Sequence, residues 1–181
     1  MHETETTTLE TNTHVELYGV DRVRQLIKGW PALSAVEKSR KLREIEPDSR
    51  GSTHNVTTQT LTQYNADDLN PEQSPTNLEA THLALGSDDT APERSNETLN
   101  NEILRLSATD VIGESEGFDV VVFLDSATAN GEHILEGGLV DDTENALLNH
   151  TLWSDPEGRL DPKTETTVAN LIVELRWGDA G

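Results

Sequence analysis

A strict alternation near the C-terminus constrains the fold of this chain more than any other feature. Over residues 164–177, apolar side chains recur at every second position: Ala169, Leu171, Val173, Leu175 and Trp177. Successive side chains of a strand point to opposite faces, so this spacing places the whole set on one face of a β-strand. The chain is therefore expected to be built around strands.

Further short strands are expected at a spacing typical of all-β proteins. The segment 117–125, GFDVVVFLD, is apolar on both faces and is typical of a central strand. The other expected strands cover residues 81–86, 99–111, 133–140 and 146–153. Turn residues separate them without intervening helices, which indicates a mainly β protein, an antiparallel β-sandwich.

The composition limits the size of the core and the kinds of site. At 181 residues, with 33% apolar and 4% aromatic residues, the chain has a modest core, which favours one β-rich unit over a large enzyme body. The absence of cysteine excludes disulfides and thiolate metal sites. No run of 18 apolar residues is present, so we expect no membrane-spanning helix. The acidic, threonine-rich start, MHETETTTLETNTH, lacks the basic and apolar stretches of a signal peptide.

The charge of the chain indicates adaptation to salt. The net charge is −21, and only four residues are lysine. Such self-repulsion weakens a small fold in dilute salt, but the Debye length falls to about 3 Å at molar salt. An acidic, lysine-poor surface is typical of proteins from extreme halophiles. The alternative, a disordered acidic protein, is disfavoured by the periodic apolar runs.

The first 52 residues differ in character from the rest. We expect residues 1–52 to form an N-terminal α-helical and extended arm, and residues 53–181 to form the sandwich domain. Residues 1–14 look disordered or arm-like. Two short helices follow, separated by Gly29-Trp30-Pro31, and Ser34 with Glu37 forms a capping-box pattern at the start of the second helix.

Basic residues gather in this N-terminal part. Residues 21–50 carry a net charge of +3, whereas residues 51–181 carry −20. An excess of +3 is a weak footprint for DNA, so we expect no nucleic-acid partner and favour the acidic body of a sister subunit. The expected docking residues are Arg22, Arg24, Lys28, Trp30, Lys38, Arg40, Lys41 and Arg43.

The stretch Glu136–Trp153, EGGLVDDTENALLNHTLW, raises the question of a ligand loop. Gly137 and Gly138 match neither a P-loop nor a dinucleotide-binding loop, so a bulge or a close backbone approach is favoured. The acidic residues Asp141, Asp142 and Glu144 lack the spacing of an EF-hand. A solvated hairpin turn is favoured over a Ca²⁺ or Mg²⁺ site.

No recognisable catalytic set is present in the sequence. The histidines lack the spacing of a zincin helix, and there is no G-x-S-x-G motif. His82, His133 and His150 lie in or beside expected strands and could converge, but ordinary strand residues are favoured. We therefore expect no enzyme activity, no catalytic or metal-binding residues and no cofactor.

Two stretches, ATHLALG…NEILR (residues 80–105) and HILEGGL…LIVELRW (residues 133–177), together resemble a loose group of structural proteins from tailed viruses. One is ATHLALG followed by Thr98-Leu99-Asn100-Asn101-Glu102-Ile103-Leu104-Arg105, which is similar to a "hxAlG … txLxNExxR" pattern. The other is an "I-x-E-x-G-L … L-l-n … K-t … W" ending, here carried by Ile134, Glu136, Gly138, Leu139, Leu147, Leu148, Asn149 and Lys163. The resemblance spans roughly residues 54–177 and departs from the pattern at Val140 and at Arg176-Trp177.

The resemblance implies a non-enzymatic component of a virion, in a tailed virus or provirus of a halophilic archaeon. Such a protein would form a symmetric homo-oligomer in a turret or spike, a neck or collar, or a tail or baseplate appendage. Its other partners would be capsid, portal, neck or tail proteins, contacted through the N-terminal arm, and it would be assembled in the host cytoplasm. The alternative is a module that binds carbohydrate or the host cell surface, with Trp30, Trp153 and Trp177 as aromatic platforms.

Overall fold

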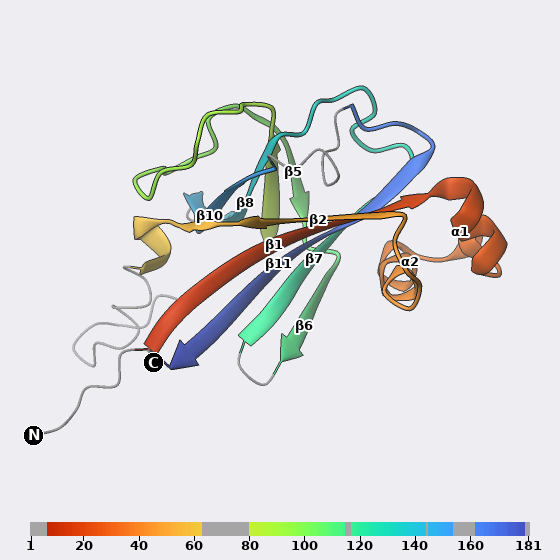
Figure 1. Cartoon of the computed structure of the whole chain (residues 1–181), viewed down its shortest axis with the longest axis horizontal. Coiled ribbons are helices and arrows are strands. Elements are labelled where there is room, and N and C mark those ends of the chain that lie inside the picture. Colours follow the sequence, from red (N-terminus) through yellow and green to blue (C-terminus); the bar gives the residue numbers. More distant parts are fainter. Residues whose placement is uncertain (1–6, 63–79, 115–116, 144, 154–161, 180–181) are drawn as a thin grey trace, which may run out of the picture.

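Two antiparallel β-sheets pack face to face in this protein (Figure 1). The structure is a computed structural model and describes residues 7–62, 80–114, 117–143, 145–153 and 162–179 of the 181-residue chain. The prediction of a mainly β protein, an antiparallel β-sandwich, is confirmed.

The first sheet has five strands in the order β2-β1-β11-β7-β6. Its two longest strands, β1 and β11, run side by side over thirteen residue pairs, from Thr7 opposite Asp179 to Gly19 opposite Thr167. The strands are β1 (Thr7–Gly19), β2 (Ser49–His54), β6 (Asp110–Glu114), β7 (Gly117–Leu124) and β11 (Thr167–Asp179).

The second sheet has the order β3-β10-β8-β4-β5, with β9 paired to β8 beside this path. The expected strand at residues 81–86 and the expected hairpin at residues 133–153 both belong to it. The strands are β3 (Val56–Thr57), β4 (His82–Gly86), β5 (Glu102–Ser107), β8 (Glu136–Asp141), β9 (Ala146–Leu147) and β10 (Asn149–Leu152).

The main core lies between the two sheets. The alternating residues of β11 expected on one face, Ala169, Leu171, Val173 and Leu175, are all buried there. Strand β7 is buried on both faces, as predicted: Val120 and Val122 belong to this core, whereas Phe123 contacts the helices on the other side. The side chain of Trp177 lies outside the described part of the structure.

Two helices and a 3₁₀ turn cover part of the outer face of the first sheet, near the junction of β1 with the start of β11 (Figure 1). A second apolar cluster joins them to the sheet through Tyr18, Val23, Trp30 and Leu42. The capping box is formed, because Ser34 Oγ accepts from Glu37 N–H and Glu37 accepts from Ser34 N–H at 2.8 Å. The elements are α1 (Val20–Leu26), η1 (Trp30–Ala32) and α2 (Ala35–Leu42).

The N-terminal segment differs from the expected arm. Residues 7–19 form β1, which lies between β2 and β11 in the interior of the first sheet. The expected boundary between residues 52 and 53 falls inside β2. The strand was missed because Thr11 and Thr13 occupy buried positions where an alternation of apolar residues would be sought.

The expected strand at residues 99–111 is also corrected. It is two strands, β5 and β6, which belong to different sheets. The chain crosses between the sheets at Ala108 and Thr109. Ala108 N–H donates to the carbonyl oxygen of Thr81, just before β4, and Thr109 N–H donates to that of Val121, on β7. A change of hydrogen-bonding partner at this point is a tertiary effect that the local apolar spacing does not encode.

Candidate functional site

The two stretches that carry the viral resemblance meet at a buried carboxylate. Glu136, on β8, has no exposed surface. Its Oε1 accepts the backbone N–H of Asn101 at 2.8 Å, and its Oε2 accepts that of Asn100 at 3.2 Å. Oε2 also lies 2.8 Å from Nε2 of His150, on β10. One side chain therefore ties the loop before β5 to both strands of the hairpin.

His150 is held at both ring nitrogens. Its Nδ1 lies 2.9 Å from Oδ1 of Asn96, and that oxygen also accepts the N–H of Glu93 at 2.6 Å. Both side chains are fully buried, so the imidazole links the Glu136 carboxylate on one side to the Asn96 amide on the other. We define Glu136, His150, Asn96, Asn100 and Asn101 as the buried clamp, named for its two buried side chains, Glu136 and His150.

Glycines make room for the buried clamp. A Cβ on Gly86 would overlap the Glu136 carboxylate and the backbone oxygen of Asn101. A Cβ on Gly137 would overlap the ring of Trp153, and one on Gly138 would overlap the carbonyl oxygen of Asn149. The close-approach interpretation of Gly137 and Gly138 agrees with this packing.

A bulge is present in the hairpin, but its extra residue lies on the strand opposite the glycines. Val140 pairs with Leu147, whereas Gly137 pairs with Thr151, so three steps along β8 correspond to four along β9 and β10. At this point, Oδ1 of Asn149 accepts the N–H of Leu139 at 2.6 Å. The asparagine side chain thus replaces a main-chain acceptor where the register shifts.

The acidic turn is bonded internally. Oδ1 of Asp141 accepts the N–H of Thr143 at 2.9 Å, and Asp142 pairs with Arg105 at 3.1 Å. Arg105 also donates to Oδ1 of Asn145 at 2.8 Å. Glu144 lies outside the described residues. Within the described ranges, no group of three or more His, Asp or Glu residues is placed to hold a metal ion.

The buried clamp has the composition of an acid–base pair but no access for a substrate. Carboxylate–imidazole pairs transfer protons when a substrate reaches them. Here both side chains have 0% exposure, and neither is among the residues that line the pockets next to α1. His82 does not join them, because its ring bonds to the hydroxyls of Thr81 and Ser107, both at 2.9 Å. The arrangement serves to tie a loop to a hairpin.

Most of the expected docking residues are engaged within the chain. Their charges are neutralised by acids of the sheet and of the helical segment itself, and Arg40 binds its carboxylate through two nitrogens. The ion pairs are Arg22–Asp48, Arg40–Asp110, Lys41–Glu44 and Arg43–Asp119. Among the described residues, Arg24 and Lys28 alone of the eight have no polar or aromatic partner.

The tryptophans in the described structure are core residues. Trp30 is 5% exposed, packs edge-on against Phe123 at 6.0 Å between centroids, and carries the Lys38 ammonium 5.6 Å from its ring centroid. Trp153 is 2% exposed and belongs to the main core. Neither ring is available as a platform for a sugar.

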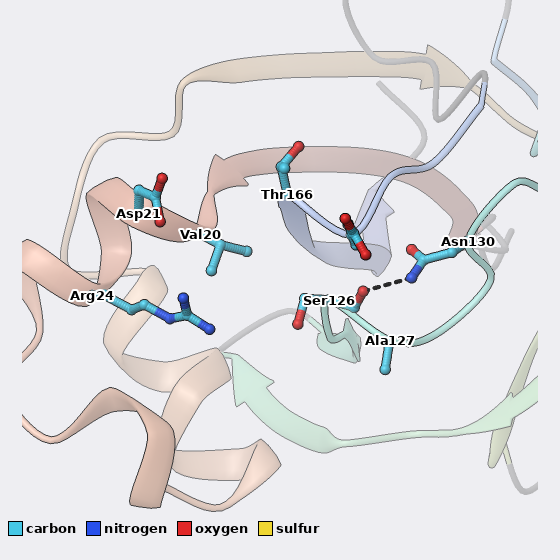
Figure 2. Close-up of a pocket in the computed structure, with 8 residues that line it drawn as sticks. Val20, Asp21, Arg24, Ser126, Ala127, Asn130 and Thr166 are labelled. Atoms are coloured by element: carbon cyan, nitrogen blue, oxygen red, sulfur yellow. Dashed lines mark hydrogen bonds between the residues drawn. The ribbon is translucent and has the colours of Figure 1, made fainter.

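A polar pocket lies between α1 and the turn that follows β7 (Figure 2). Its volume is about 460 Å³. Val20 and Ala127 supply its apolar part, and the guanidinium of Arg24 points across it toward Ser126. Arg24 was expected to be a docking residue. No local sequence pattern indicates the pocket, because its walls come from segments about a hundred residues apart or more.

The protonation of the buried carboxylate sets an acid limit on stability. Burial raises the pKa of Glu136, but the hydrogen bonds from His150, Asn101 and Asn100 outweigh it, so that this pKa lies below its usual value. The Arg40 hydrogen bond likewise lowers the pKa of Asp110. A lowered folded-state pKa adds stability above the unfolded-state value of about 4 and loses it as the pH falls through the folded-state value.

We therefore expect the urea midpoint to fall as the pH is lowered from 5 to 3 at constant molar salt. Glu136→Gln should show a shallower fall than the wild type over this range, because it lacks one of the titrating groups. The measurement is a series of urea unfolding curves at fixed pH. A midpoint that stays constant or rises on acidification would contradict the assignment.

Comparisons with protein-family models, with curated proteins and with solved structures found no match. No helix in the described part of the chain is long and apolar enough to cross a membrane.

Proposed function

We propose that this chain is a non-enzymatic structural protein of a tailed-virus particle that assembles as a symmetric homo-oligomer. The observation that carries the proposal is the buried clamp. It brings the "NExxR" region and the "ExGL … LLN" region of the resemblance into one hydrogen-bonded unit. Each motif is weak alone. Because the two are in contact in the fold, they support a structure shared with the tailed-virus proteins better than two separate matches would.

The polar chemistry of the described residues also fits a scaffold. The carboxylate–imidazole pair is buried, and the acidic turn is bonded to Arg105 and to its own backbone. The groups that an enzyme would present to a substrate are here used to hold loops to strands. The acidic composition fits assembly in concentrated salt, where repulsion between like-charged subunits is screened.

The edge strand β6 offers a surface for self-association. It is the outer strand of the first sheet, and such a strand presents unpaired main-chain groups. Val111, on β6, is 56% exposed although it pairs with the core residue Val120. The neighbouring Asp110 carboxylate is already neutralised by Arg40, which lowers the electrostatic cost of bringing a second copy to this edge.

Val111→Lys is expected to weaken self-association at least about tenfold, because it replaces a valine buried on assembly by a charge. The matched control is Leu26→Lys, which changes the other 56%-exposed apolar residue, on α1 and away from the edge. Size-exclusion chromatography with light scattering at molar salt measures both variants over a range of concentrations.

Three outcomes would argue against this part of the proposal. One is a monomer at every concentration with no association with virus particles, and another is equal weakening by the two substitutions. The third is an oligomer that Val111→Lys leaves intact, which would exclude the β6 edge and leave the choice among the remaining edges β2, β3 and β5.

Docking to other virion proteins, such as capsid, portal, neck or tail components, would use the helical segment through Arg24 and Lys28, which have no partner among the described residues. The protein would then reside in the virion after assembly in the host cytoplasm. Its station would be a turret or spike, a neck or collar, or a tail or baseplate appendage. Labelling of particles with an antibody against the chain distinguishes these stations.

The alternative, a module that binds host carbohydrate, has less support. Two of the three tryptophans suggested as platforms, Trp30 and Trp153, are buried. A glycan array at molar salt tests the alternative directly. Saturable binding to one glycan class by the native protein would favour it over a purely structural role.

A further inference from the structure

The pocket beside α1 is open to solvent, and hydrogen bonds hold part of its lining in place. Oδ1 of Asp125 accepts the N–H groups of Ala127 and Thr128, both at 2.8 Å, which fixes the turn after β7. Nδ2 of Asn130 donates to the carbonyl oxygen of Ser126 at 2.7 Å (Figure 2). The wall formed by Ser126, Ala127 and Asn130 is therefore preformed, as walls of small-molecule sites usually are.

A buried lysine, Lys163, holds Asn130 of this wall in place by a hydrogen bond. Lys163 is 2% exposed, and its ammonium donates to Oδ1 of Asn130 at 3.0 Å. Its main chain also joins the turn, since Gly131 N–H donates to Lys163 O at 2.9 Å and Lys163 N–H donates to Glu132 O at 3.1 Å. These bonds fix the turn relative to the segment that carries Glu165 and Thr166 into the pocket.

Opposite charges line the pocket without neutralising each other. Arg24 faces the hollow, and Asp21 and Glu165 lie on its walls. Within the described ranges, none of the three forms an ion pair or a side-chain hydrogen bond. Most other arginines of this acidic chain are paired, as Arg22, Arg40 and others show. The pocket therefore offers one arginine and two carboxylates that are unpaired within the described residues. These charges are complementary to a ligand that carries both a negative and a positive group.

We propose that this pocket binds a small zwitterion, with its carboxylate on Arg24 and its ammonium group between Asp21 and Glu165. A volume of about 460 Å³ falls in the range of small-molecule sites, roughly 300–1,000 Å³. Direct ion pairs survive at molar salt better than long-range attraction, because their separation is comparable with the Debye length of about 3 Å. The inference stands whether or not the chain assembles into a particle.

The test uses the full chain at molar NaCl and three probes with the same number of carbons. They are 4-aminobutanoate, which carries both charges, butanoate, which carries the negative charge, and butylammonium, which carries the positive one. Titrations followed by ¹H–¹⁵N NMR should show saturable shifts at Arg24 Nε–H and at the amide of Ala127 with 4-aminobutanoate. Butanoate and butylammonium should each bind roughly tenfold more weakly, because each lacks one charge-assisted contact.

Arg24→Gln should weaken binding of 4-aminobutanoate by at least about tenfold. Lys28→Gln is the matched control, because it removes the same charge close by in the chain without lining the pocket, and it should leave the affinity within about twofold. Amide spectra of both variants report folding. The proposal is overturned if no probe gives a saturable shift, if butanoate binds as tightly as 4-aminobutanoate, or if a folded Arg24→Gln protein keeps the native affinity.

Discussion

Glu136→Ala is expected to lower the free energy of unfolding by about 3 kcal/mol, because a buried polar group left without its hydrogen-bond partner costs about 1–3 kcal/mol and this carboxylate has three such partners. The substitution leaves Nε2 of His150 without its partner and the backbone N–H groups of Asn100 and Asn101 without an acceptor. It also opens a cavity beside Gly86. Urea unfolding at constant molar salt measures the change, with the m-value checked for two-state behaviour.

The control for this variant is Glu132→Ala, which removes the same side chain from an exposed position and should change stability by less than about 0.5 kcal/mol. A double-mutant cycle of Glu136→Gln with His150→Gln separates the Glu136–His150 interaction from the other contacts of each side chain. A loss below about 1 kcal/mol for Glu136→Ala would show that the clamp is not a major source of stability.

Trp153→Ala is expected to cost about 3–5 kcal/mol, as for other large core aromatics. The ring is 2% exposed and lies against Gly137, so its removal leaves a void in the main core that the hairpin cannot fill. Far-UV circular dichroism follows urea unfolding without relying on the missing indole. Leu26→Ala, at a 56%-exposed position, should stay within about 0.5 kcal/mol of the wild type.

This result bears on the choice between a scaffold and a carbohydrate-binding module. A platform tryptophan is solvent-exposed, so its removal abolishes binding and leaves stability nearly unchanged. Removal of a core tryptophan lowers stability strongly, whereas no loss of sugar binding is expected. An unchanged urea midpoint in Trp153→Ala would contradict the packing described here and would restore the platform interpretation.

The elements that the sequence predicted well are those whose burial follows a simple period. In strand β11, the alternating residues Ala169, Leu171, Val173 and Leu175 all lie in the main core. Strand β7 is apolar on both faces because it contacts a sheet on one side and helices on the other. The capping box at Ser34 and the hairpin around Asp141 were recognised because their signals lie within a few residues of each other.

The main omission, strand β1, has a physical explanation. Its inward positions include Thr11 and Thr13, whose hydroxyls contact Thr57 and Asn55 instead of joining an apolar core. Threonine suits a pleated strand, but it carries little hydrophobic signal. The sequence of this segment is therefore typical of a polar arm, and only its pairing with β11 identifies it as a strand.

One residue in the sequence points indirectly to the pocket beside α1. Lys163 is the only lysine after residue 41, and an isolated lysine in so acidic a region is a candidate for an internal role. Its partner Asn130 lies 33 positions away, and α1 lies more than 130 positions away. No local pattern relates these segments, because they meet through the packing of β1, β7 and β11.

By itself the sequence determined the β-sandwich class, the hairpin, the two helices and the strongly acidic net charge, because each depends on local periodicity or on composition. Only the tertiary structure decided that β1 lies inside the first sheet. It also decided that most of the arginines expected to dock form ion pairs with acidic residues of the same chain. The tertiary structure also brings Glu136 next to His150 and forms the pocket that Arg24 lines. These outcomes depend on which distant side chains meet, and contacts of that kind are set by strand order and sheet packing.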